Sequence, residues 1–138
     1  MQVSKNFTLA EFTDSQTAAR EGIDNTPSPE VLSRIKHTAE QLEKVRKILG
    51  YPINISSGYR SPELNKRVKG AANSQHVRGE AVDFTCPKFG TPREIVEKVK
   101  AYSIPYDQLI LEFDRWVHIS FTQGINRKQV LVIGTSSL

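Results

Sequence analysis

The sequence has little of several features that would mark other classes of protein. It contains a single cysteine, Cys86, which excludes an internal disulfide framework and a cysteine-rich zinc site. No apolar run is long enough to cross a bilayer, and residues 1–8 (MQVSKNFT) have no apolar stretch of the kind found in secretory signals. We therefore expect no membrane partner, and a protein that is made and held in the cytoplasm, without a signal peptide, until another agent releases it.

What the chain does contain is typical of a soluble globular protein. Of its 138 residues, 38% are hydrophobic and 25% are charged. This length suits one domain, residues 1–138, with a single core. The net charge of +4 is compatible with an anionic partner such as nucleic acid or a bacterial wall polymer, but the excess is too small to discriminate between them.

Helix signals come first along the chain and strand signals cluster later. Residues 1–27 give only weak helical signals, with one capping box at Thr8 and Glu11. Three stronger helix starts pair a capping hydroxyl with a proline, at Ser28-Pro29, Ser61-Pro62 and Thr91-Pro92. Alternating or apolar runs predict strands at 53–56, 80–85, 106–113, 116–121 and 129–133.

This order predicts an α+β fold, in which helices pack on a small, largely antiparallel sheet. We expect its core to span about residues 28–122, preceded by an irregular N-terminal segment and followed by a short C-terminal tail.

Three residues of types that bind zinc fall where the strand pattern sets them apart from apolar neighbours. In the strand 80–85, Asp83 faces away from the apolar residues that flank it, and in the strand 116–121 (WVHISF) the same alternation isolates His118. His76 precedes the aspartate by seven residues. Two imidazoles and one carboxylate form a three-ligand zinc site with an open fourth position, which is the pattern of a catalytic zinc site. We expect this site in a cleft on the sheet.

The remaining histidine, His37, is predicted on the polar face of the helix that begins at Pro29. We interpret it as a solvated helix residue rather than a metal ligand.

The loop between the two late strands decides which residue faces His118. A two-residue loop would pair Phe113 with Trp116 and place their apolar faces on opposite sides, whereas a three-residue loop would pair Phe113 with Val117. Glu112 would then lie directly opposite His118, with their Cβ atoms about 5 Å apart. A carboxylate in that position would be suited to act as a general base.

Three motifs in order resemble those of the zinc D-alanyl-D-alanine carboxypeptidase family. Residues 74–83 (SQHVRGEAVD) match the pattern Ser-x-His-x-x-Gly-x-Ala-x-Asp, residues 116–118 (WVH) look like the second motif, and residues 57–65 (SGYRSPELN) resemble the block that carries a substrate-binding arginine. The family includes carboxypeptidases, dipeptidases and phage endolysins that cut peptidoglycan stem peptides. The resemblance covers about residues 28–122 and is strongest to the compact single-domain members.

The resemblance implies a role for each matching residue. His76, Asp83 and His118 would hold one Zn²⁺ ion, and Arg60 would bind the terminal carboxylate of the substrate, thereby placing the scissile bond for catalysis. Ser74 would form a hydrogen bond near the same substrate group. The implied partner is a peptidoglycan peptide, with no nucleic acid, and the expected state is a monomer.

The general base is where the sequence departs from the family pattern. Several members place the catalytic acid three residues before the last histidine, where this chain has Arg115. Compact members often carry instead a leucine-isoleucine-x-glutamate strand, which residues 109–112 (LILE) match. We therefore predict Glu112 as the catalytic base and keep Asp114 as the alternative.

Two functions are consistent with these motifs. The first is a zinc metallopeptidase that hydrolyses peptidoglycan stem or cross-link peptides, as a D-Ala-D-Ala carboxypeptidase or as an endopeptidase. It would act on the cell wall in phage lysis, prophage release or wall turnover. The second is a non-catalytic wall-binding or phage structural module that keeps the fold and the zinc site but has lost its base, an alternative that Arg115 supports.

Overall fold

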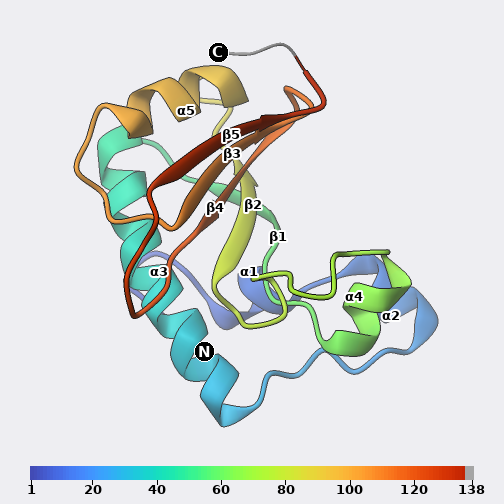
Figure 1. Ribbon diagram of the computed structural model, residues 1–138. Helices are drawn as coiled ribbons and strands as arrows, with labels where there is room; N and C mark the ends of the chain where they lie inside the picture. The colour runs from blue at the N-terminus through green and yellow to red at the C-terminus, as the bar shows by residue number, and fades with distance from the viewer. Residues whose placement is uncertain (136–138) are drawn as a thin grey trace.

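The computed structural model describes residues 1–135, and the last three residues of the predicted C-terminal tail, 136–138, lie outside that range. Helices and strands occur in the order expected for an α+β fold, which confirms the predicted class (Figure 1). The helices are α1 (Leu9–Thr13), α2 (Gln16–Glu21), α3 (Pro29–Leu49), α4 (Pro62–Arg67) and α5 (Pro92–Lys100). The strands are β1 (Asn54–Ser57), β2 (Ala81–Thr85), β3 (Gln108–Glu112), β4 (Trp116–Ser120) and β5 (Gln129–Ile133).

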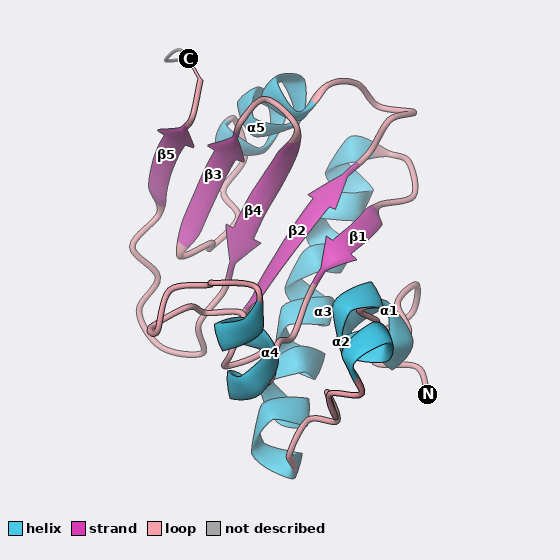
Figure 2. Cartoon of the chain, turned by 90° about the vertical axis from the view of Figure 1, so that its right-hand side faces the viewer, coloured by secondary structure: helices cyan, strands magenta, loops and turns pink. Residues whose placement is uncertain are grey.

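The strands form one sheet in the order β1-β2-β4-β3-β5. All neighbouring strands are antiparallel except β3 and β5, which run parallel. Helices α3 and α5 cover one face of the sheet, whereas α1, α2 and α4 gather at the end of the sheet near β1 (Figure 2). The face away from α3 is thereby left available for a site. Within residues 1–135, no helix combines the length and apolarity needed to cross a membrane.

Helix α3 forms as its sequence predicts and supplies one layer of the core. The side chain of Ser28 caps its first turn, Pro29 occupies the first helical position, and Gly50 ends the helix with a φ of 77°. Burial of each large aliphatic side chain contributes about 1.5–3 kcal/mol to folding. The buried residues of its apolar stripe are Ile35, Ala39, Leu42, Val45 and Leu49.

The N-terminal segment is more regular than predicted. Helix α1 begins at the predicted capping box, but α2 was missed; Ser15 caps it and Gly22, at a φ of 67°, ends it. Phe7 and Phe12 are each 1% exposed and belong to the main hydrophobic core. Apolar residues of β5 pack against the same core, which therefore extends past the expected range of 28–122 at both ends.

The register predicted for the β3–β4 hairpin is wrong by two residues. Glu112 pairs with Trp116, and it is Ile110 that lies opposite His118. The turn uses two consecutive non-glycine residues, 113–114, at φ values of 57° and 55°. Residues other than glycine rarely adopt this left-handed conformation, so the residue types at 113–114 did not reveal the turn. Because side chains alternate with a period of two, the shift leaves Glu112 on the same face as His118.

Gly79 lies where the turn that carries His76 meets α3. Its φ is 77°, and a Cβ atom added there would lie 2.9 Å from Ile35 Cγ1 and 3.1 Å from Val31 Cγ1. Its carbonyl also accepts a 2.8 Å hydrogen bond from the buried hydroxyl of Thr38. We expect Gly79→Ala to lower the free energy of unfolding by about 2–4 kcal/mol, because it combines a left-handed alanine with a steric clash. Urea denaturation would measure this loss.

Gly22 provides the matched control for that substitution. It has a φ of 67° but no neighbouring atom within 4 Å of an added Cβ. Gly22→Ala should therefore cost only the conformational part, about 1–2 kcal/mol. Equal losses at the two positions would show that contact with α3 does not constrain the turn.

Candidate metal centre

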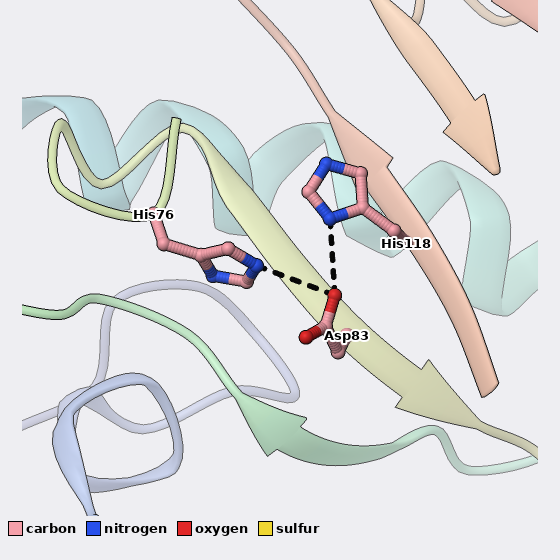
Figure 3. A group of neighbouring side chains, drawn as sticks. All are labelled: His76, Asp83 and His118. Carbon is pink, nitrogen blue, oxygen red and sulfur yellow. Dashed lines mark hydrogen bonds and ion pairs between the residues drawn. The ribbon is translucent and has the colours of Figure 1, made fainter. Parts of the chain in front are cut away.

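The structure brings the three predicted ligands together from separate parts of the chain. Asp83 on β2 and His118 on β4 are direct partners in the antiparallel pairing of these strands. His76 approaches from the turn that precedes β2, and the three side chains point toward one another (Figure 3). Pairing of β2 with β4 therefore brings two of the three ligands together, and the turn before β2 adds the third.

One carboxylate oxygen lies at the centre of the cluster. His118 Nδ1 lies 3.0 Å from Asp83 Oδ1, and His76 Nε2 lies 3.3 Å from the same oxygen. The candidate ligand atoms all lie within 4.8 Å of one another. Among residues 1–135 no other group of three or more histidine, cysteine, aspartate or glutamate side chains is arranged in this way, and His37, half-buried on α3, takes no part.

The tautomer of His76 makes the donor set suitable for a metal ion. Its Nδ1 lies 2.7 Å from the carbonyl oxygen of Gly58, and a carbonyl only accepts, so Nδ1 carries the proton. In the neutral ring the lone pair of Nε2 then faces the carboxylate of Asp83, and two acceptors oppose each other. A cation between them satisfies both, and two imidazoles with one carboxylate are ligands that zinc prefers. The residues present therefore fit a zinc ion.

The environment of Asp83 keeps its side chain in the form that a metal requires. Burial by itself would raise the pKa of Asp83, but a hydrogen bond from His118, one from His76 when both of its ring nitrogens carry protons, and the charge of these rings when protonated lower the pKa well below its ordinary value. The carboxylate is consequently ionised at neutral pH.

The predicted substrate-binding residues line the same cleft as the ligands. This cleft has a volume of about 620 Å³, and its walls include Arg60, Ser74 and all three members of the cluster. The backbone N–H of Arg60 donates to the carbonyl of His76 at 3.1 Å, and its Nη2 donates to Ser74 Oγ at 3.3 Å. The Nε atom of this arginine is buried and has no hydrogen-bond partner. The guanidinium is thus fixed beside the cluster with part of its donor capacity unused.

Of the two candidate bases, only Glu112 lines the cleft. Its side chain is half-buried, and its Oε2 accepts a 2.5 Å hydrogen bond from the indole N–H of Trp116. Asp114 is exposed in the turn and accepts two 3.1 Å hydrogen bonds from Arg93 on α5. Arg115, at the position where several family members have an acid, is exposed and does not line the cleft. The geometry therefore favours Glu112 over Asp114.

A partly buried polar network beside the cluster was missed by sequence reasoning. Gln75, next to His76, is 8% exposed and donates through Nε2 to Asp107 Oδ2 at 3.1 Å. Arg127 holds the same carboxylate through three side-chain hydrogen bonds, the shortest 2.7 Å, and these lower the pKa of Asp107. The network ties the ligand turn to the start of β3. Its members are 20 or more positions apart in sequence, so no local motif indicates them.

Comparison with known proteins agrees with this geometry. No curated protein matches the chain. A model of the Peptidase M15 family matches residues 5–120, which include the metal cluster, Arg60, Ser74 and Glu112. The match begins closer to the N-terminus than the resemblance predicted for residues 28–122, in agreement with the N-terminal contribution to the core. Peptidases of this family depend on zinc, in agreement with the histidine and aspartate donors found here. The chain belongs to the peptidase M15 family.

Proposed function

We propose that this protein is a zinc-dependent hydrolase of peptidoglycan stem or cross-link peptides. The observation that carries the proposal is the presence of the His76, Asp83 and His118 cluster, Glu112 and Arg60 in a single cleft. When bound, zinc would polarise the scissile carbonyl and lower the pKa of a water molecule to about 7. The protein must then supply a base for that water and a grip on the substrate.

Glu112 is the residue we assign as general base. It lies on the same face of the sheet as His118, two residue pairs along the β3–β4 ladder, and its carboxylate is held by Trp116. It would take a proton from the attacking water and return it to the leaving amine. The indole hydrogen bond orients the carboxylate, so Trp116 acts as a positioning residue.

Arg60 and Ser74 are the residues we assign to substrate binding. Ser74 Oγ accepts hydrogen bonds from Arg60 Nη2 and from the backbone N–H of His76, which links the arginine to the ligand turn. A guanidinium can grip a carboxylate or a carbonyl through its planar set of donors, which a lysine does not reproduce. This grip would hold the scissile bond against the metal.

The site of action is part of the same proposal. A net charge of +4 favours contact with an anionic bacterial wall. We propose action on the wall after release from the cell that makes the protein, as in phage or prophage lysis. This role has the support of the family resemblance alone.

Incubation of the zinc-loaded protein with purified muropeptides, followed by mass spectrometry, tests the proposal. We expect cleavage products that disappear with a chelator and return when zinc is added, because hydrolysis would require zinc bound at the cluster. Peptides of L-residues with the same length serve as the control for substrate class and should remain intact. Bound zinc without muropeptide cleavage would instead favour the non-catalytic wall-binding module.

A further inference from the structure

A second cavity lies directly beside the metal cleft and shares a wall with it. It has a volume of about 520 Å³, and Arg60 lines both spaces. Its other walls include Gln16 and Thr17 from α2 and the segment 56–59 at the end of β1. The space available to a ligand therefore continues past the arginine, on the side of α1 and α2.

The segment between the two spaces also contacts the metal cluster. Ser57 is paired with Asp83 across β1 and β2, and the carbonyl of Gly58 accepts the hydrogen bond from His76 Nδ1. Both Ser57 and Gly58 line the second cavity. A substrate held at the metal would thus meet this cavity immediately beyond Arg60.

Arg60 has an unused donor where the two spaces meet. Its Nε is buried without a hydrogen-bond partner, whereas its Nη2 donates to Ser74 Oγ. A backbone carbonyl of a peptide that passes from the cleft into the second cavity would accept a hydrogen bond from this donor.

We propose that the second cavity is a substrate subsite, which binds the peptide segment that continues past Arg60. The inference rests on the proposed function and narrows it: the protein is an endopeptidase for cross-linked peptides rather than a carboxypeptidase for free D-Ala-D-Ala ends. Arg60 contacts a backbone carbonyl of the substrate. The hydroxyl and amide groups of Gln16, Thr17 and Ser57 suit the polar backbone of such a segment.

A pair of substrates and a pair of tryptophan variants test the subsite. The short substrate is a stem pentapeptide that ends in D-Ala-D-Ala, and the long one is a cross-linked dimer of the same peptide. Gln16→Trp fills the cavity from an exposed position, and Gln123→Trp makes the same change at an exposed position that lines neither space. We expect the wild type to prefer the long substrate, and Gln16→Trp to lower its kcat/KM for that substrate by about tenfold, because contacts beyond the scissile bond are lost.

The same variant should cleave the short substrate within about twofold of the wild-type rate, and Gln123→Trp should match the wild type on both. Equal rates on the two substrates, or equal losses for the two variants, would overturn the subsite.

A binding experiment separates failure of the subsite from failure of the proposed function. In the Glu112→Gln variant, the long peptide should shift the amide NMR signals of Gln16 and Thr17, and the short peptide should not. Such shifts without any cleavage by the wild type would reject the hydrolase but retain the subsite, and their absence would reject the subsite.

Discussion

Glutamine in place of Glu112 should lower kcat for muropeptide hydrolysis by about 10²–10⁴-fold, the range typical for loss of a general base. The substitution keeps the shape of the side chain, and its amide oxygen can still accept the hydrogen bond that Trp116 now donates to the carboxylate. What it removes is the ability to take up a proton. Steady-state kinetics with a quantified zinc content would measure the effect, and the metal content should stay at that of the wild type.

Asp114→Asn is the matched control for that experiment. It makes the same chemical change two residues away, where the carboxylate contacts Arg93 on α5 and lies outside the cleft. We expect its kcat to remain within about threefold of the wild type, since no reacting group is touched. A large loss in Asp114→Asn together with an active Glu112→Gln would reverse the assignment of the base.

Alanine in place of His118 should weaken zinc binding by more than about 100-fold, because loss of a partner outside the metal shell already costs 10–100-fold. The side chain contributes one of only three donors in the cluster, and its nitrogen lies 3.0 Å from the shared oxygen of Asp83. Competition with a chromophoric chelator would measure the affinity, and hydrolysis should be lost with the metal. The far-UV circular dichroism spectrum should match that of the wild type, which would show that the fold is retained.

His37→Ala is the control that separates the cluster from histidine content in general. His37 is half-buried on α3 and is not part of the cluster. Its removal should leave the zinc affinity within about twofold, since neither the donors nor the residues that orient them change. Equal losses in the two variants would show that the metal binds elsewhere on the protein.

Local rules predicted those features of the fold that depend on neighbouring residues. Ser28, Pro29 and Gly50 set the limits of α3 through capping chemistry, and the structure has the same limits. The alternation around Asp83 and His118 placed both side chains on the face opposite the apolar residues, and pairing of β2 with β4 brings them together. Helix α2 carried similar signals, with Ser15 as cap and Gly22 at its end, and these could have revealed it.

Features that depend on distant residues or on unusual backbone conformations were not predictable in this way. The hairpin turn places Phe113 and Asp114 at positive φ, and Glu112 lies two residue pairs along the strands from the predicted position opposite His118. The network of Gln75, Asp107 and Arg127 joins segments that only the tertiary fold brings together. The parallel pairing of β5 with β3 likewise has no signature in either strand.

The separation of the ligands along the chain links metal affinity to the folding equilibrium. Asp83 and His118 are 35 positions apart and meet only when β2 and β4 are paired, so an unfolded chain offers no comparable donor set. Zinc at a concentration 100 times its dissociation constant would then stabilise the native state by about 2.7 kcal/mol. Depletion of the ion would make the thermal midpoint fall, and the same protein would become easier to cleave by proteases.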